Sequence, residues 1–477
     1  MFKKPAFLWA ALSAAVLSGC SMIPTYQRPA APVAAQFPAL PGLDVASTAT
    51  PAADIQWQSF FADAKLKQLL EAALKNNRDL RIAVLNIEQA RAQFQIRRAD
   101  QFPTIGAALA GSRQAVGSAS SNSGSIASVY SAGLAVTAYE LDFFGRVASL
   151  KEAALAQYLA TEEGRKTAQI SLIASVATTY LALLADEELL SITQQTLDTR
   201  RATYKLATLR FDNGVSSELD VRAAESLLEA ANTALAQQTR QRALSGNALT
   251  LLVGQSLEGE LALGSSKALD ATAFQDVPAG LPSDLLVRRP DIRQAEQLLI
   301  AANANIGAAR AAFFPRISLT ASAGSASSRL SGLMQSGSWG WTLAPQLLLP
   351  IFDAGRNSAG LASSKAAEGI AVAGYEKAIQ TAFKEVADAL AGRATYAEQL
   401  RAAQAQANAE AVRYRLADLR YQNGVASQLD QLDAQRSLFA ARQAVVQVRL
   451  AQLQSQVTLY KVLGGGWTDE TVATRAP

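Results

Sequence analysis

One segment occurs twice in this chain, and the two copies align without a gap. Residues 76–103 read NNRDLRIAVLNIEQARAQFQIRRADQFP, and residues 288–315 read RRPDIRQAEQLLIAANANIGAARAAFFP. Pro103 matches Pro315 at a spacing of 212 residues. Because a repeat of this length is one structural unit written twice, the sequence predicts a fold built from two similar halves.

A second pair of motifs lies further along each half. LRFDNGVSSELD at residues 209–220 returns as LRYQNGVASQLD at 419–430, and Gly145-Arg146 returns as Gly355-Arg356, all at a spacing of 210. The two-residue difference between the spacings arises between Ser112 and Gly145. We expect it in a loop, because loops tolerate changes of length.

The composition excludes several classes of protein. The chain has no histidine, and its one cysteine is Cys20. This removes Ser-His-Asp hydrolysis, most zinc chemistry and any disulfide within one chain. The net charge is +4, or +2 without residues 1–19, so nucleic-acid binding is not indicated. The carboxylates are scattered at helical spacing and form no acid/base or metal constellation, so we expect neither an enzyme nor a bound cofactor.

The N-terminus has the pattern of a bacterial export and lipidation signal. Residues 1–19 combine a basic start with an apolar run that is too short to span a bilayer, as in a secretory signal peptide. Leu17-Ser18-Gly19-Cys20 resembles a lipobox, which implies cleavage before Cys20 and attachment of lipid to its sulfur and amine. Ser21 after it implies sorting to the outer membrane. The alternative is an incidental or buried cysteine.

Six prolines between Pro24 and Pro51 keep residues 20–56 extended, so we interpret this segment as a strap between the lipid anchor and the body. The body is expected to comprise repeat 1 at residues 57–265, a linker at 266–281, repeat 2 at 282–466 and a C-terminal tail at 467–477.

Two very long helices are predicted, one in each half. Residues 104–277 and 351–476 contain no proline. Within these stretches apolar residues recur at three- and four-residue steps. We expect helices over about 146–210 and 356–420. Roughly 65 residues of helix make a rod of about 100 Å.

Each rod is predicted to turn back on itself. Asn213-Gly214 and Asn423-Gly424 readily adopt the positive φ of a tight turn. Ser217-x-x-Asp220 and Ser427-x-x-Asp430 match capping boxes, which start the return helices. The helical hairpins are expected at about 146–253 and 356–463.

Two β-hairpins are predicted before the rods. Residues about 104–141 and 316–352 alternate small or polar residues with apolar ones, and aromatic residues such as Tyr139 and Trp341 lie near the segment ends. These features are typical of outer-membrane barrel strands, and a soluble four-stranded sheet is the alternative. In lipid, four strands would leave open edges, so several chains would share one barrel. Two chains give a filled barrel of eight strands, and three give twelve strands and a pore.

In this combination the chain resembles the outer membrane factor family of TolC-like and OprM-like channels, and most of all its lipoprotein branch. The resemblance covers nearly the whole chain. Its motifs are LSGCS at 17–21, NGVSSELD at 213–220, AARAAFFPRISLTASAG at 308–324, LPIFDAGR at 349–356, NGVASQLD at 423–430, LDAQRSLF at 432–439 and LYKVLGGGW at 459–467.

The resemblance implies a mixed α/β membrane protein. Three copies would form a twelve-stranded transmembrane β-barrel in the outer membrane, continued by a twelve-helix periplasmic α-barrel. Each chain would be an internal duplication of a short helix, a β-hairpin and a long helical hairpin. The implied partners are a periplasmic adaptor, also called a membrane fusion protein, and an inner-membrane pump of the resistance-nodulation-division class. The channel would passively export antibiotics, detergents or solvents without any cofactor.

The resemblance also implies where the periplasmic end closes. Asp430 and Asp433 match an acidic ring at the entrance. Asp220 and Tyr421 match a hydrogen-bonded link between neighbouring hairpins. Simpler roles stay open, because Asp220 and Asp430 are third in their capping boxes, and Asp433 could pair with Arg436 one turn later. The ring of Tyr421 matches a phenylalanine in the first half and could serve packing.

One gate position departs from the family pattern. A TolC-like gate has an arginine at the position of Ala426, so Arg420 or a hydrophobic constriction is the expected substitute. The adaptor would dock on the two turns, at Asn213, Gly214, Val215, Ser216, Asn423, Gly424, Val425 and Ala426.

Two other functions share part of these features. The outlet of a type I protein secretion system has the same fold. A periplasmic scaffold or adaptor lipoprotein also has a lipid anchor and helical hairpins. Such adaptors carry one hairpin flanked by Gly-rich lipoyl-like halves, whereas two hairpins are predicted here, each after a pair of strands.

Overall fold

A computed structural model describes residues 21–34, 36–38, 52–118, 121–258, 269, 274–275, 277 and 288–467. The predicted signal peptide and Cys20 lie outside the described residues, as do most of the predicted linker and the part of the predicted tail after Trp467.

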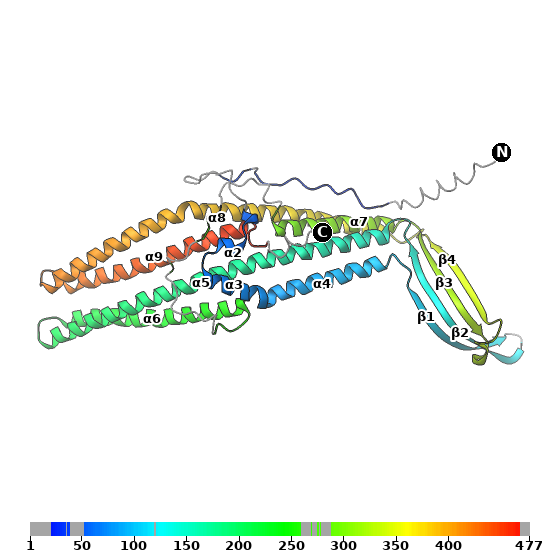
Figure 1. The fold of residues 1–477 in the computed structure, drawn as a ribbon, viewed down its shortest axis with the longest axis horizontal. Coiled ribbons are helices and arrows are strands. Elements are labelled where there is room, and N and C mark those ends of the chain that lie inside the picture. The colour runs from blue at the N-terminus through cyan, green and yellow to red at the C-terminus, as the bar shows by residue number, and fades with distance from the viewer. Residues whose placement is uncertain are drawn as a thin grey trace. The chain divides into compact units, whose positions relative to one another are not determined.

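Helices and strands follow the same order in both halves of the chain (Figure 1). The first half contains α4 (Arg78–Ala99), β1 (Ile105–Ser118), β2 (Ser121–Leu141), α5 (Arg146–Asp212) and α6 (Glu218–Val253). The second half contains α7 (Pro290–Ala311), β3 (Arg316–Ser327), β4 (Trp339–Leu348), α8 (Arg356–Gln422) and α9 (Gln428–Val462). Short elements are η1 (Ala52–Asp54), α2 (Trp57–Phe60), α3 (Ala64–Asn76) and η5 (Leu330–Gly332).

The two long helices confirm the expected rods. Helices α5 and α8 have 67 residues each, which corresponds to about 100 Å. Helix α5 contains an apolar stretch long enough to cross a membrane, but 67% of that stretch is buried, as in a core helix.

Contacts divide the chain into two compact units, each with parts of both halves. One unit includes Asn86–Glu162 and Gln294–Glu376 and contains all four strands. The other includes Glu163–Arg293 and Lys377–Pro477 and contains both helix turns.

The strands form one antiparallel sheet in the order β1-β2-β3-β4, in which neighbours in sequence are neighbours in space (Figure 1). Strands β2 and β3 join the two halves, with Val136 opposite Ala321 and Leu141 opposite Ile317. Strands β1 and β4 are the edges, and every residue of β4 is exposed.

A β-bulge lies near the end of β2. The pairing with β3 shifts by one residue between Val136 and Tyr139, and Ala138 has a φ of 52°. A bulge inserts one extra residue into a strand. One of the two extra residues of the first half therefore lies within β2, which corrects our expectation that both lie in a loop.

The two helix turns have the predicted local chemistry. Gly214 and Gly424 have φ values of 73° and 74°, a region that glycine adopts without a steric penalty. Ser217 begins α6 and Ser427 begins α9, each in a complete capping box with the aspartate three residues later. Local sequence thus determines where both return helices start.

The core around α9 is aromatic. Phe60 of α2 stacks on Tyr460 with ring centroids 4.0 Å apart, and both rings are buried. The Tyr460 hydroxyl donates to the Ile55 carbonyl at 2.6 Å, which satisfies its polar atom. The segment before α3 is thereby fixed to the end of α9.

One face of α7 binds the start of the strap. Asn303 donates to the Pro24 carbonyl at 2.8 Å, and Glu296 accepts hydrogen bonds from Tyr26 and Arg28. A Cβ at Gly307 would lie 2.7 Å from the Ile23 side chain. Residues 296, 303 and 307 are spaced by seven and four, so they share a face of the helix.

We predict that Gly254→Ala destabilises the protein more than Gly464→Ala. The two glycines match each other in the repeat, with φ values of 78° and 84°, so alanine at either costs about 1–2 kcal/mol. Only at Gly254 would the new Cβ also meet backbone, at 2.5 Å from the Asn76 oxygen. Thermal unfolding in detergent, followed by circular dichroism, should show the larger loss for Gly254→Ala. Equal losses would contradict the assigned clash.

Candidate functional site

A chain of hydrogen bonds links the two helix turns within one chain. Tyr421 is buried, and its hydroxyl donates to Gln428 Oε1 at 3.2 Å. The Gln428 amide donates in turn to the backbone oxygen of Asp220 at 3.2 Å. The predicted partners Asp220 and Tyr421 are therefore connected through Gln428 and a backbone carbonyl. Sequence reasoning missed Gln428, whose match in the first half is Glu218.

The carboxylates of Asp220 and Asp430 close their capping boxes. Asp220 accepts from the Ser217 backbone at 3.1 Å and from its hydroxyl at 2.8 Å. Asp430 accepts from Ser427 in the same way, at 3.2 and 2.8 Å. Among the described residues, both carboxylates thus cap the N-termini of their helices.

Asp433 lies in a cluster of charges on one hairpin. It accepts from Arg413 at 2.7 Å and from Arg436 at 2.5 Å, so the expected pair with Arg436 is present. The hydrogen bonds from Arg413 and Arg436 hold the pKa of Asp433 below its usual value. Asp433 therefore stays ionised to a lower pH than an isolated aspartate. The contact with Arg413, 20 residues away, was not predicted from sequence.

Arg420 turns towards its own loop. Its guanidinium donates to the Val425 carbonyl at 3.4 Å. The cation over Tyr421 is instead Arg210, whose guanidinium carbon lies 4.8 Å from the ring centroid. Arg210 matches Arg420 in the repeat, so the repeat could have identified Arg210 as a second candidate gate residue.

The turns predicted to dock the adaptor are closed on themselves and present one apolar residue each. Asn213 and Asn423 donate from their side chains to carbonyls of the preceding helix turn, both at 2.7 Å. Val215 is 70% exposed and Val425 is 63% exposed. Each turn therefore offers a rigid loop with a valine at its surface.

The interiors of the two hairpin ends differ. Between α5 and α6 the contact is apolar, with Ala207, Val221 and Ala224 buried together. Between α8 and α9 it is polar, because buried Gln431 donates to Asp418 at 2.5 Å. The side-chain oxygens of Gln431 and Gln435 have no partner among the described residues. The glutamines at 428, 431 and 435 are spaced by three and four residues, so the sequence already placed them on one face of a helix.

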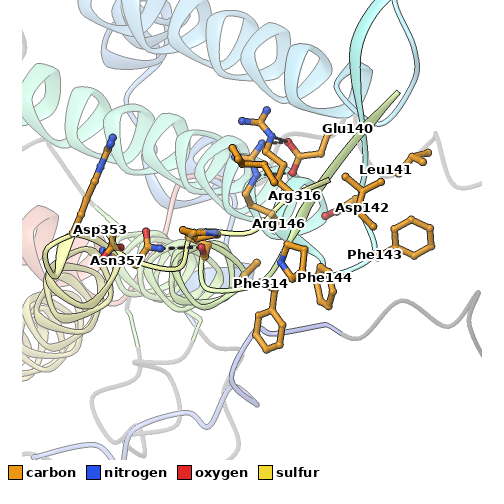
Figure 2. Close-up of a pocket in the computed structure, with 17 residues that line it drawn as sticks. Glu140, Leu141, Asp142, Phe143, Phe144, Arg146, Phe314, Arg316, Asp353 and Asn357 are labelled. Carbon is orange, nitrogen blue, oxygen red and sulfur yellow. Dashed lines mark hydrogen bonds and ion pairs between the residues drawn. The ribbon is translucent and has the colours of Figure 1, made fainter. Parts of the chain in front are cut away.

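In the unit that contains the four strands, the junction between strands and helices is held by an ion cluster (Figure 2). Glu140 accepts from Arg146 at 2.7 and 2.6 Å, and Arg316 reaches the same carboxylate at 2.6 Å. Phe144 and Phe314 stack beside it with centroids 4.8 Å apart. This cluster joins the first half to the second.

The matching junction of the second half lacks this cluster. Pro350 matches Glu140, and Arg356 matches Arg146. Arg356 is exposed and has no ion pair among the described residues. The cation is thus present at both junctions, whereas the second junction has no carboxylate at the position of Glu140.

Within the described residues, no group of three His, Cys, Asp or Glu side chains could hold a metal ion.

Arg146→Ala is expected to destabilise the protein more than Arg356→Ala. The first change removes two charge-assisted hydrogen bonds from the largely buried Glu140, at a cost of about 1–3 kcal/mol. The second removes an exposed, unpaired side chain, which should change stability by less than about 0.5 kcal/mol. Thermal unfolding of both variants in detergent tests this. A larger effect of Arg356→Ala would show that Glu140 does not hold the junction.

A comparison with known proteins identifies relatives along nearly the whole chain. The family model described as outer membrane efflux protein matches residues 69–255 and 281–465. The probable efflux pump outer membrane protein TtgC of Pseudomonas putida is 51% identical over 464 residues, covering 97% of this chain and 96% of that protein. Outer membrane protein OprJ of Pseudomonas aeruginosa is 44% identical over 470 residues, covering 98% and 97%.

The fold is also similar to that of solved channels. The open state of the Neisseria gonorrhoeae MtrE outer membrane channel aligns with a TM-score of 0.84 and 41% identity, covering 94% of this chain and 99% of that one. The mixed helix and strand architecture expected from the sequence is therefore shared with outer membrane channels. This chain belongs to the outer membrane efflux protein family.

Proposed function

We propose that this chain is the outer membrane exit duct of a tripartite efflux system. It passively conducts drugs, detergents or solvents that an inner-membrane pump of the resistance-nodulation-division class and a periplasmic adaptor deliver. The observation that carries this proposal is the sheet with two free edges, continued by helices of 67 residues. Relatives named as antibiotic, toluene and solvent efflux pump proteins support the class of cargo.

The duct is a homotrimer. Four strands cannot close, and three copies supply the twelve strands that leave a pore inside a barrel. The α5–α6 and α8–α9 hairpins of three copies supply a wall of twelve helices. Repeat 1 at residues 57–265 and repeat 2 at 282–466 are the two wall segments of each copy. A periplasmic scaffold would be expected to protect its edge strands with charged residues, and β4 has none.

The periplasmic end is held closed by the linked turns. Tyr421, Gln428 and the Asp220 carbonyl connect the two hairpins of one copy, and the Asp433 cluster adds charge at the same end. The adaptor docks on the turns at 213–216 and 423–426, where Val215 and Val425 are exposed.

The lipid anchor is Cys20. Residues 22–28 lie on α7 through hydrogen bonds to Glu296, Asn303 and Arg310, so a lipid on Cys20, two residues before Met22, would be held beside the same unit as the strands. The anchor therefore supports the barrel in one membrane.

Deletion of the gene tests the efflux function. With the cognate pump and adaptor present, the deletion strain is expected to become more susceptible to the pump's drugs or solvents, and the wild-type gene should restore resistance. A strain lacking the pump serves as the control, and deletion of the gene in that strain should cause no further loss of resistance. Unchanged susceptibility of the deletion strain would contradict the proposal.

We expect the double variant Tyr421→Phe, Gln428→Leu to increase single-channel conductance in planar bilayers. It removes the hydrogen bond from Gln428 to Asp220 between the hairpins and the bond from Tyr421 to Gln428 within the second hairpin, while it keeps the size of the side chains. Glu218→Leu is the control, because Glu218 matches Gln428 but is exposed and, among the described residues, pairs only with Arg222 of its own helix. Conductance equal to that of the wild type would remove Tyr421 and Gln428 from the gate.

A further inference from the structure

Among the described residues, cation–π contacts join α5 to the second half of the chain at three places. Each contact places a cation of α5 over an aromatic ring of the second half, within the compact unit that contains both helix turns. The pairs are Lys166 with Trp467, Arg200 with Phe439 and Arg210 with Tyr421. The Arg210 contact belongs to the linked turns, whereas the Arg200 contact lies outside them.

Arg200 is the buried cation of this set. Only 4% of its surface is exposed, and its guanidinium carbon lies 5.3 Å from the centroid of the Phe439 ring. Its Nη1 donates to the Leu227 carbonyl of α6 at 2.9 Å. Its Nε has no hydrogen-bond partner, and no carboxylate pairs with the guanidinium, within the described part of the chain.

A charge in this position needs other groups to offset its lost hydration. Burial holds the pKa of the Arg200 guanidinium below its usual value. The side chain nevertheless stays protonated at neutral pH, as arginine does in proteins. The groups that stabilise the charge are the Leu227 carbonyl and the face of the Phe439 ring, whose quadrupole attracts a cation most strongly where water is excluded.

We propose that Arg200 is a positioning residue of the periplasmic gate, which ties α9 to the α5–α6 hairpin through the ring of Phe439. This rests on the proposed closure of that end by the linked turns. It adds a second tie between the hairpins, ten residues along α5 from Arg210, or about 15 Å. Because the guanidinium contacts α6 at Leu227 and α9 at Phe439, it restrains the second hairpin against the first.

The repeat shows that the duplicated backbone does not require this tie. At a spacing of 210, Arg200 matches Glu410 and Phe439 matches Glu229. Glu410 pairs with Arg413 of its own helix at 3.1 Å, and Glu229 is exposed. Two carboxylates thus replace the cation and the ring, and α8 and α9 still form the same helical hairpin. The contact is therefore a specific addition to the first half rather than a condition for folding a hairpin.

Single-channel recordings of the full-length protein in planar bilayers test the tie. Arg200→Met and Phe439→Leu are each expected to raise the ratio of open to closed time by roughly 2- to 30-fold, the equivalent of about 0.5–2 kcal/mol for one cation–π contact. Arg200→Lys should keep most of the wild-type ratio, because an ammonium group is also attracted to the ring. Unchanged ratios in both Arg200→Met and Phe439→Leu would overturn the proposal.

Arg201→Met is the matched control. The side chain of Arg201 is 60% exposed and pairs with Asp198 of the same helix, so its removal should leave the ratio of open to closed time unchanged. An increase as large as that of Arg200→Met would show that any loss of positive charge on α5 opens the channel. That result would overturn the assigned contact with Phe439.

The double variant Arg200→Met, Phe439→Leu distinguishes one contact from two independent effects. If the two side chains act on each other, the double variant should open the channel no more than Arg200→Met alone. Additive effects, or opening by Arg200→Met but not by Phe439→Leu, would overturn the tie to α9. Phe439→Leu leaves the bond from Arg200 to Leu227 in place, and thermal unfolding in detergent checks that each variant is folded.

The linked turns provide the comparison that separates this inference from the gate on which it rests. If Tyr421→Phe, Gln428→Leu raises conductance while Arg200→Met and Phe439→Leu do not, the tie is wrong and the proposed gate stands. If none of these variants differs from the wild type, the proposed closure at this end is wrong together with the tie. Restored drug resistance in the deletion strain would still support the proposed duct in either case.

Discussion

The backbone hydrogen bonds of the two edge strands are the constraint on which the rest of the structure depends. Strands β1 and β4 have partners on one side only, and in hydrocarbon each unsatisfied backbone group costs several kcal/mol. Bulges, charges and prolines protect edges in water, but Pro345 is the only such device on β4 among the described residues of that strand. Edge strand β4 is therefore less protected in water than β1, which carries Arg113 and a register shift between Val116 and Ser118, and in the proposed barrel both edges would gain a partner strand.

The helical hairpins show how one duplicated backbone can acquire two chemistries. Both return helices begin with the same capping box, which requires only local sequence. Their interiors have diverged, since Val221 matches Gln431 and Glu218 matches Gln428. An apolar contact loses its stabilisation when water enters, whereas unpaired glutamine oxygens gain hydrogen bonds from water. Near the turn, α8 and α9 are held by hydrogen bonds and an ion pair, whereas α5 and α6 are held by an apolar contact.

Local signals in the sequence were sufficient for the helices and turns. The proline-free stretches, the Asn-Gly pairs and the Ser-x-x-Asp motifs each act on the backbone within a few residues. The observed long helices, turns and helix caps agree with them. The bulge at Ala138 was not predictable, because alanine gives no signal for a positive φ. Contacts of Asp433 with Arg413 and of Gln428 with Asp220 depend on how helices pack, so spacing along the chain did not reveal them. The lipidation of Cys20 stays a prediction outside the described residues.

The ion cluster around Glu140 distinguishes the join within a chain from the joins between copies in the proposed trimer. Within a chain, the join of the two halves combines backbone pairing with Glu140 held by Arg146 and Arg316. In the proposed join between copies the matching positions are Pro350, Arg356 and Thr104, which contain no acid. Pairing of two strands of the same chain also costs less entropy than pairing of strands that belong to separate chains. In the proposed trimer, the join within each copy therefore has an ion cluster that the matching positions between copies lack.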